Sequence, residues 1–392
     1  PARRRARRAA GVRVSGQPVI VVGAGPVGLA TAVALHARGR EVVVLDARTG
    51  IPDDPRATTV QPRVLEIFDA LGVLAPMLDL GLEVPSLQYF ESTTGELLAE
   101  LRYASIAAHT SCPYRLHLSQ PAICRILYDA LPVGTVRWGA RVVDVKDDGE
   151  HAVVHLDGEE TLVGSWVVGA DGLNSTVRKA VGIGNETGSR ASFLTCEADL
   201  ELAQHLPERF GTCAYLFHGR DWVLAMRMRD CIRLLFPVPD GLTPRDAAKD
   251  ENLLQWTAPL LGGELPLHAL RDRAAYTVQQ RLATTLRRGR VLLAGDAAHN
   301  AFPVGGMAMN AGIVDGYLLA HSLLVGTEAA IDAYGTERRE QLREGILAET
   351  LHTMRTLSAR GVVQRWSRRR ALERLASDPT AARDHLLALS LL

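Results

Sequence analysis

Three glycines in the segment "VIVVGAGPVGLA" have a spacing that suits phosphate binding: Gly23, Gly25 and Gly28 follow an apolar run and precede a helix-forming segment. In such a GxGxxG turn, the first glycine makes the turn, the second lets a pyrophosphate approach the backbone, and the third lets the helix pack against the strand. Asp46 ends the next apolar run, where a carboxylate can accept hydrogen bonds from ribose hydroxyls. Because an acidic residue there disfavours a 2′-phosphate, the pattern predicts NAD or FAD rather than NADP. A plain glycine turn between packed elements is the alternative.

Two later apolar runs also end in glycine and aspartate: "GADGLNSTVR" over 169–178 and "GDAAHNAFPVGGMAMNAG" over 295–312. Ligands of open α/β sheets lie at the carboxyl ends of the parallel strands, so three such ends indicate a ligand longer than one nucleotide. Taken singly, each Gly-Asp pair is equally typical of an ordinary turn. His299 lacks partners at metal-ligand spacing, and we interpret it as a structural hydrogen-bonding residue.

The elements that would position these turns alternate between strands and helices. Strands are expected at 19–22, 41–45, 166–168 and 290–294, a helix at 26–38, and further helices from about residue 62 and over 118–131. Three antiparallel strands are expected between 141 and 164, because two Asp-Gly turn signals separate alternating runs there. Residues 186–282 are strand-rich with one helix at 244–260, and 306–392 is helical.

These elements predict an α/β fold in which a parallel nucleotide-binding sheet carries an inserted β-rich domain and C-terminal helices. The expected boundaries are a basic, solvated tail at 1–16, a discontinuous nucleotide-binding domain at 17–185 and 283–345, a substrate domain at 186–282, and a helical segment at 346–392.

The composition excludes several classes of function. The 392 residues carry 44 basic and 44 acidic side chains, so no net charge attracts nucleic acid or a membrane surface. The five cysteines form no CxxC pair, and no cluster with metal-ligand spacing occurs, so we expect no metal site and a reduced, cytoplasmic setting. No apolar run reaches the roughly 18 residues of a membrane span.

The three motifs together resemble those of the FAD-dependent aromatic hydroxylases, the class A flavoprotein monooxygenases with the p-hydroxybenzoate hydroxylase fold. The phenol and polyketide-ring hydroxylases are the more similar branch, and the resemblance runs from about residue 17 to 345. It implies FAD as cofactor, bound in a sheet of glutathione-reductase type, and NADH or NADPH as a transient electron donor near Arg56 and Arg178. The cofactor-binding residues that it implies are Gly23, Gly25, Pro26, Val27, Gly28, Asp46, Ala47, Arg56, Gln120, Asp171, Arg178, Asp296, Pro303, Gly305, Gly306, Ala308, Met309 and Asn310.

The resemblance also gives the turn after Asp296 a role. Asp296 would hold a ribityl hydroxyl, and backbone at Pro303, Gly305 and Gly306 would lie against the flavin ring with no side chain between. Pro303 and Arg56 are the residues expected in the catalytic flavin environment. A helix from about residue 307 would direct its positive end at the flavin. The chain departs from the family in having Phe302 before Pro303, which adds bulk at the ring, and Ala308 where a glycine is usual.

The implied reaction is NAD(P)H- and O2-dependent hydroxylation of a phenolic or polyketide-like ring through a flavin 4a-hydroperoxide. Two alternatives are a flavoenzyme of the same fold with epoxidase, Baeyer–Villiger, dehydrogenase or halogenase chemistry, and a non-catalytic interaction protein. Candidate substrate contacts in the inserted sheet are Tyr215, His218, Arg227 and Tyr276, with cross-strand packing or solvent exposure as the alternative for each. Apolar neighbours at 216, 217, 224 and 226 favour a sizeable aromatic substrate. A monomer or a homodimer is expected.

Overall fold

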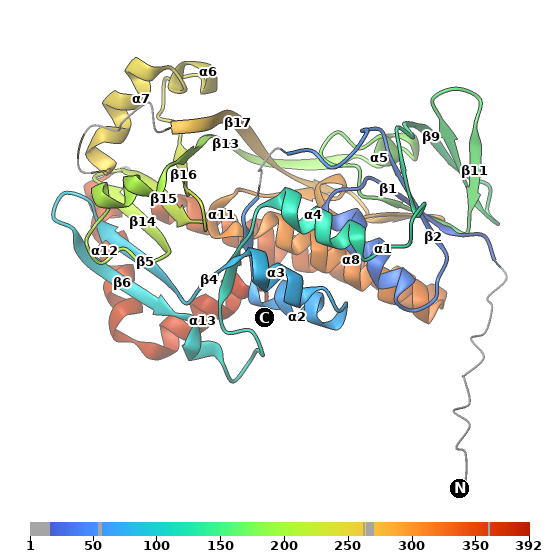
Figure 1. The fold of residues 1–392 in the computed structure, drawn as a ribbon, viewed down its shortest axis with the longest axis horizontal. Helices are drawn as coiled ribbons and strands as arrows, with labels where there is room; N and C mark the ends of the chain where they lie inside the picture. Colours follow the sequence, from blue (N-terminus) through green and yellow to red (C-terminus); the bar gives the residue numbers. More distant parts are fainter. Residues whose placement is uncertain (1–15, 54–56, 262, 264–269, 360) are drawn as a thin grey trace, which may run out of the picture.

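The computed structural model describes residues 16–53, 57–261, 263, 270–359 and 361–392. The expected tail, up to residue 15, and Arg56 lie outside the described residues. Figure 1 shows an elongated molecule with the nucleotide-type sheet at one end and a larger sheet at the other. The long strands β13 and β17 run between the two ends.

The first sheet has the strand order β18-β19-β12-β1-β2-β8. Its strands are β1 (Val19–Val22), β2 (Val42–Asp46), β8 (Val136–Trp138), β12 (Trp166–Gly169), β18 (Arg287–Arg288) and β19 (Val291–Leu293). All neighbours are parallel except β18, which pairs antiparallel with β19. Strands β1, β12 and β19 are buried along their whole length, as continuous apolar runs require in a sheet covered on both faces. The three expected glycine-bearing strand ends are therefore neighbours.

The second sheet has the order β20-β17-β13-β16-β15-β14-β5-β6. Its strands are β5 (Ser86–Glu91), β6 (Glu96–Arg102), β13 (Asn185–Ala198), β14 (Cys213–His218), β15 (Asp221–Arg227), β16 (Ile232–Pro237), β17 (Leu270–Ala283) and β20 (His299–Asn300). The sheet of the strand-rich block predicted at 186–282 also includes strands from outside that range. Strands β5 and β6 come from much earlier in the chain, and β5 pairs parallel with β14, a long-range pairing that local periodicity does not encode.

Two small antiparallel sheets complete the strands. One has the order β11-β10-β9 and contains β9 (Val142–Asp147), β10 (Ala152–Leu156) and β11 (Thr161–Gly164), as the two Asp-Gly turns predict. The other has the order β3-β7-β4 and contains β3 (Thr59–Val60), β4 (Leu82–Val84) and β7 (Arg115–His117). This second small sheet places β7 beside the functional site described below.

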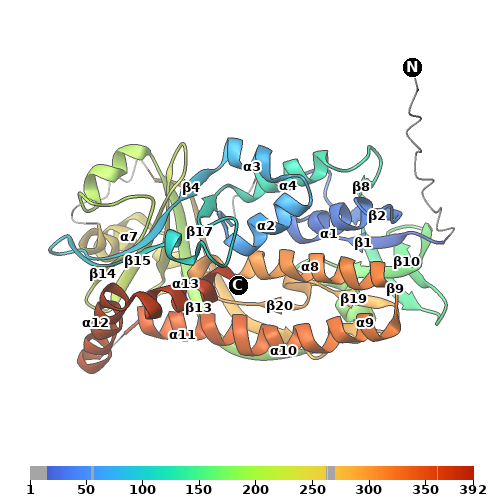
Figure 2. The same cartoon turned by 90° about the horizontal axis from the view of Figure 1, so that it is seen from below.

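The helices pack around both sheets (Figure 2). They are α1 (Pro26–His36), α2 (Pro62–Ala70), α3 (Leu74–Leu80), α4 (Gln120–Asp129), α5 (Thr176–Ala180), α6 (Pro244–Ala247), α7 (Asp250–Thr257), α8 (Ala308–Val325), α9 (Glu328–Ala333), α10 (Arg339–Gln341), α11 (Ala348–Leu357), α12 (Val362–Ser377) and α13 (Pro379–Ser390). The single helix expected over 244–260 is instead α6, α7 and a short 3₁₀ turn.

Helix α8 packs closely against α1 because glycine replaces larger side chains at the contact. A Cβ atom at Gly316 would lie 2.2 Å from Oγ1 of Thr31, and one at Gly312 would lie 2.7 Å from Cγ2 of Val27. By length and composition, Val304–Val325 is apolar enough to cross a membrane, but 56% of that window is buried inside the protein. The segment is therefore a core helix of the nucleotide-binding part.

The last helices cover one side of the second sheet. The Arg368 guanidinium on α12 donates to the carbonyl of Gly219 at 2.7 Å and lies 4.2 Å from the Phe217 ring centroid. Nε1 of Trp222 donates to Oγ of Ser358 at 3.1 Å. Hydrogen bonds and a cation–π contact thus join the C-terminal helical segment to the β14–β15 hairpin.

Candidate functional site

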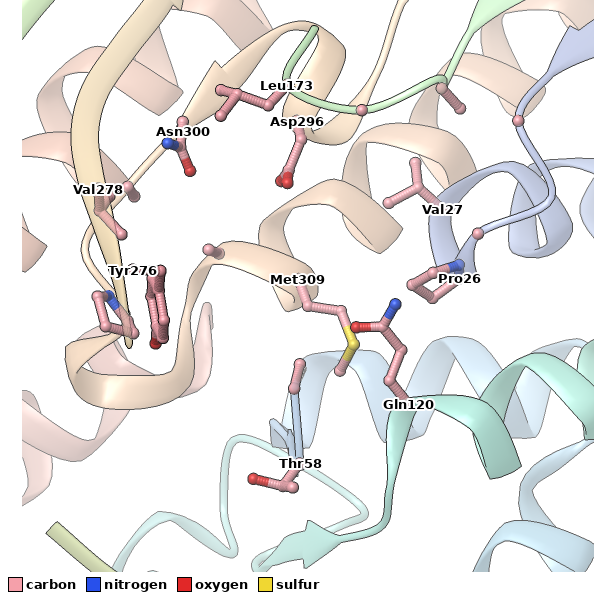
Figure 3. A pocket seen from close by; sticks show the side chains of 18 of the residues that line it. Pro26, Val27, Thr58, Gln120, Leu173, Tyr276, Val278, Asp296, Asn300 and Met309 are labelled. Carbon is pink, nitrogen blue, oxygen red and sulfur yellow. The ribbon is translucent and has the colours of Figure 1, made fainter. Parts of the chain in front are cut away.

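A cavity of about 910 Å³ runs from the carboxyl ends of the parallel strands to the inner face of the second sheet. Figure 3 shows Asp296, Val27 and Pro26 around one part of it, with Tyr276 and Val278 at another. Its walls include residues that follow β1, β2, β12 and β19, and residues of β14 to β17. The strand ends that the sequence singled out thus open into one continuous space.

The glycine turn after β1 is shaped by backbone contacts. Gly23 has φ +107°, and a Cβ atom there would lie 2.3 Å from the carbonyl oxygen of Ala170. At Gly28 a Cβ atom would lie 1.9 Å from the carbonyl oxygen of Gly23, so this glycine serves packing and does not line the cavity. Gly25 does line it, and no atom lies within 4 Å of its Cβ position. No side chain in the described part of the chain caps α1, so its amino end, with Pro26 and Val27, faces the open space.

Asp46 and Ala47 also line the cavity, but the Asp46 carboxylate is already engaged by the protein. It accepts hydrogen bonds from the Ala24 amide at 2.7 Å and from two guanidinium nitrogens of Arg48, at 2.6 and 2.9 Å. Burial acts to raise the pKa of Asp46, but the hydrogen bonds from Arg48 and Ala24 outweigh it and lower that pKa. Arg48 lines the same part of the cavity, although the motif analysis did not single it out.

The turn after β12 presents one unsatisfied carboxylate oxygen. Asp171 lines the cavity, and its Oδ2 accepts from the amides of Thr176 and Val177 at 2.7 and 3.1 Å, which caps α5. Its Oδ1 is buried and has no hydrogen-bond partner in the described part of the chain. A ligand donor would satisfy this atom.

Arg178 differs from its expected role, because its side chain does not reach the cavity. The guanidinium is buried and donates to the carbonyls of Ala297 at 2.8 Å and Leu173 at 3.2 Å. These bonds join the turn after β12 to the turn after β19. Arg178 is a positioning residue for two ligand-facing loops.

The turn after β19 is held by a buried charge network around Asp315 of α8. The carboxylate accepts from the Gly295 amide at 3.0 Å, pairs with Nε2 of His299 at 2.7 Å, and accepts from Nε of Arg338 at 2.7 Å. Burial acts to raise the pKa of Asp315, but His299 and Arg338 lower it to about 2. His299 is therefore confirmed as a structural residue, and Asp296 is presented to the cavity.

The segment 303–310 forms a tight turn before α8. Gly305 and Gly306 have φ +75° and +66°, a region that favours glycine. A Cβ atom at Gly305 would lie 3.1 Å from Cδ2 of Leu389, and one at Gly306 would lie 3.0 Å from Cβ of Thr59. These glycines are thus needed for the turn and for packing behind it. Pro303, Gly305, Gly306, Ala308, Met309 and Gln120 line the cavity.

Two residues near this turn point away from the cavity. Asn310 is fully buried, and its amide group bonds the carbonyls of Thr59 at 2.8 Å and Gly306 at 2.7 Å, so it positions the turn instead of facing a ligand. Phe302 is 1% exposed, and its ring centroid lies 6.2 Å from that of Phe193. The expectation that Phe302 adds bulk at the flavin ring is therefore wrong, because its side chain packs in the core.

Only half of the candidate substrate residues face the cavity. Tyr215 and Tyr276 line it, together with the apolar Leu224 and Met226. His218 lies outside it, with Nδ1 3.1 Å from Oγ1 of Thr93. Arg227 is exposed and outside the cavity, although the carbonyl of this residue contacts Nδ1 of His117 at 2.9 Å.

The alternation of strand side chains explains this division. Along β14, Cys213 and Tyr215 face the cavity, whereas Leu216 packs into a second core on the opposite face. Phe217 is buried and does not line the cavity. Cavity residues that the sequence analysis missed include Thr58, Thr59, Arg115, Thr195, Cys213, Arg233, Thr277, Val278 and Asn300. Alternation on β14 to β17 would have indicated several of them once the orientation of the sheet was known.

Comparison with known proteins gives the family. Residues 17–347 match a family described as "FAD binding domain". The chain belongs to this FAD-binding family. Para-nitrophenol 4-monooxygenase of Pseudomonas sp. is 29% identical over 342 residues, covering 83% of each chain. Rifampicin monooxygenase of Rhodococcus hoagii is 31% identical over 333 residues, covering 82% of this chain and 67% of the relative.

Solved structures agree with that membership. The p-nitrophenol 4-monooxygenase of Pseudomonas putida superposes with a TM-score of 0.87 at 26% identity, covering 95% of this chain and 98% of the other. Aklavinone-11 hydroxylase, solved with FAD and aklavinone, gives a TM-score of 0.73 at 28% identity over 86% of this chain and 68% of the other. The protein is thus a flavin monooxygenase by family and fold, with its FAD-binding motifs in place.

The residues of this FAD-binding family member fit the cofactor. The space at Gly25 is open, the amino end of α1 is uncapped, and a buried oxygen of Asp171 lacks a partner. The first two features suit a pyrophosphate and the third suits a hydroxyl or N–H donor. The carboxylate of Asp296 faces the same space.

Proposed function

We propose that the protein is an FAD-dependent monooxygenase that uses NAD(P)H and O2 to hydroxylate an aromatic, phenolic or polyketide-like substrate. The observation that carries the proposal is the single cavity that joins the glycine turns of the parallel sheet to the aromatic wall of the second sheet. A long cofactor can occupy one end while a ring lies at the other. FAD, when bound, supplies the oxygen-activating chemistry, and NADH or NADPH supplies the electrons.

In this proposal each end of the cavity has its own task. The uncapped end of α1 and Gly25 hold the pyrophosphate, Asp46 lies near the ribose, and Asp296 accepts from the ribityl chain. The turn at Pro303, Gly305 and Gly306 lies beside the flavin ring. Helix α8 begins at Ala308 with no side-chain cap, and its positive end favours negative charge nearby by about 0.3–1 kcal/mol.

The second sheet positions the substrate. Tyr215, Tyr276, Leu224 and Met226 supply an aromatic and apolar wall that holds a ring and excludes water. Tyr215 also accepts a hydrogen bond from the Gly305 amide at 3.1 Å, so it joins the substrate wall to the flavin-side turn. Proximity and orientation of the ring are the main contributions that these residues make.

The placement of the five cysteines fits a cytoplasmic location. Cys112, Cys124, Cys196, Cys213 and Cys231 are free and buried. Such thiols persist in a reducing compartment, where NAD(P)H is also available.

The test is turnover by FAD-loaded protein. NADH and NADPH oxidation would be followed with a panel of phenols and larger aromatic ketides, and the product masses would be measured. We expect stimulation of oxidation by at least one aromatic compound, with a product heavier by one oxygen atom. Flavin reduction followed by a product without inserted oxygen would contradict the proposal, as would purified protein that retains no FAD.

A further inference from the structure

Arg115 is a buried cation that lines the cavity at its substrate end. It lies on β7, is 3% exposed, and shares the cavity wall with Cys213, Tyr215 and Met226. Sequence motifs did not indicate it. The proposed function gives it no task.

The guanidinium of Arg115 lacks the partners that a buried charge normally has. Its Nε donates to Oε1 of Gln61 at 3.1 Å, and its other neutral neighbours are the Tyr103 hydroxyl and the Cys213 thiol. Its carbon Cζ lies 5.3 Å from the centroid of the Tyr103 ring. Nη2 is buried with no hydrogen-bond partner in the described part of the chain, and no carboxylate there forms an ion pair with it.

The neighbouring side chains supply no negative charge at neutral pH. Burial raises the pKa of Tyr215 to about 12, and it also raises the pKa values of Tyr103 and Cys213. These groups therefore stay protonated. Arg338, in contrast, is a buried arginine whose charge is met by the carboxylate of Asp315.

An unpaired buried cation is costly, and an anion that enters beside it removes much of that cost. The position of Arg115 also places such an anion near the flavin-side turn. Gln61 accepts from Nε of Arg115 and donates through Nε2 to the carbonyl of Gly305 at 2.7 Å, so one side chain links the guanidinium to the turn. The other walls of this end include the apolar Leu235 and the aromatic Tyr276, together with Arg233 of β16, which pairs with the carboxylate of Glu197 at 3.9 Å.

We propose that Arg115 recognises a carboxylate substituent on the aromatic substrate. The ring lies against the apolar wall while the anionic group meets the guanidinium. This inference rests on the proposed function for the presence of an aromatic substrate, and it adds the charge of that substrate and the residue that selects it.

The test compares ligands that differ in charge but little in shape. The three isomeric hydroxybenzoates and the corresponding neutral hydroxybenzamides would be titrated into FAD-loaded protein, with binding read from changes in the flavin absorption spectrum. We expect at least one hydroxybenzoate to bind at least tenfold more tightly than its amide. Arg115→Met should weaken binding of that acid at least tenfold and of its amide less than threefold, and Arg115→Lys should restore part of the preference.

Arg48→Met is the matched control, because Arg48 is a cavity arginine at the nucleotide end whose charge is paired with Asp46. It should leave the preference for acid over amide unchanged. Equal weakening of acid and amide by Arg115→Met would overturn the inference, as would an unchanged preference. A lowered flavin reduction potential in Arg115→Met with an unchanged preference would overturn it too, because the guanidinium would then act on the cofactor.

Failure of the proposed function has a different signature. In that case no aromatic compound would stimulate NAD(P)H oxidation or gain oxygen, whereas the charge preference is read from ligand binding alone. Should Arg115→Met fail to fold, the comparison of wild type with Arg115→Lys still tests the inference. Lysine keeps the charge but not the planar fork, so Arg115→Lys should show a weaker preference for acid over amide than wild type.

Discussion

The two ends of the cavity bind with different parts of the protein. The nucleotide end is built from main chain: the turn at Gly23 and Gly25, the amino end of α1, and the turn after β19. Its charged side chains, such as Asp46 and Asp315, are paired with other protein groups. The substrate end is built from side chains of several strands, and its Arg115 has no ionic partner among the described residues.

This difference indicates that the cofactor end must keep its backbone geometry, whereas the side chains of the substrate end can vary. Backbone turns fix a cofactor in one position whatever the substrate. A wall of strand side chains can be changed one residue at a time without moving the backbone, so specificity is expected to reside there. The following predictions test that separation.

The largest effect is expected at the glycine turn. Gly28→Ala places a methyl 1.9 Å from the Gly23 carbonyl oxygen, and backbone cannot move away as a flexible side chain can. We expect a loss of about 3 kcal/mol or more of unfolding free energy, or no soluble protein. Gly25→Ala is the control: its Cβ position is open, so the apoprotein should melt normally while FAD affinity falls at least about tenfold. Calorimetry measures the stability of each variant, and flavin titration measures its affinity for FAD. Equal melting temperatures of Gly28→Ala and Gly25→Ala would contradict the prediction that the two glycines have different roles.

The next effect is expected at the buried network of the nucleotide end. Asp315→Asn leaves His299 and Arg338 without their carboxylate and should cost about 3–5 kcal/mol of unfolding free energy at pH 7. Because the pKa of Asp315 is lowered from 3.8 to about 2, its ionised form contributes stability above pH 4 that is lost as pH falls toward 2. Urea unfolding should therefore show that the difference in unfolding free energy between wild type and Asp315→Asn decreases below pH 4. A difference that stays constant with pH would argue against the charge network.

A smaller effect is expected where the two ends meet. Tyr215→Phe removes the hydroxyl that accepts from the Gly305 amide and leaves that buried N–H unpaired. We expect the unfolding free energy to decrease by about 1–2 kcal/mol. We also expect kcat/KM to decrease by a factor that corresponds to a similar free energy. The hydroxyl of Tyr276, at the same wall, forms no comparable bond with the turn among the described residues, so Tyr276→Phe should retain its stability. Steady-state kinetics and thermal melts of the pair distinguish a wall residue from one that also supports the turn.

The smallest effect is expected outside the cavity. His218→Ala and Arg227→Ala remove side chains that do not line it, so KM for the aromatic substrate should stay within about twofold of wild type. Initial rates over a range of substrate concentrations give this value. An increase of tenfold in KM for either variant would show that the second sheet is oriented differently from the one described.

The sequence indicated the nucleotide end far better than the substrate end, and the reason is physical. A phosphate-binding turn is encoded by consecutive residues, so Gly23, Gly25 and Asp296 could be recognised by spacing alone. Residues of the substrate wall come from strands whose inward face depends on register and on partners distant in the chain, such as β5 beside β14. The motifs predict cofactor contacts for Arg178 and Asn310, because a motif locates a residue but does not say where its side chain points. Their bonds to backbone carbonyls show the direction.

The contact between Leu389 and the turn at Gly305 makes the end of the described chain part of the site. Leu389 of α13 packs near the side of the Gly305 turn that faces away from the cavity. Arg368 of α12 bonds the β14–β15 hairpin. Removal of α13 would therefore take away one support of the loop, although no residue of that helix lines the cavity. A change in α13 is therefore also a change behind the cofactor pocket.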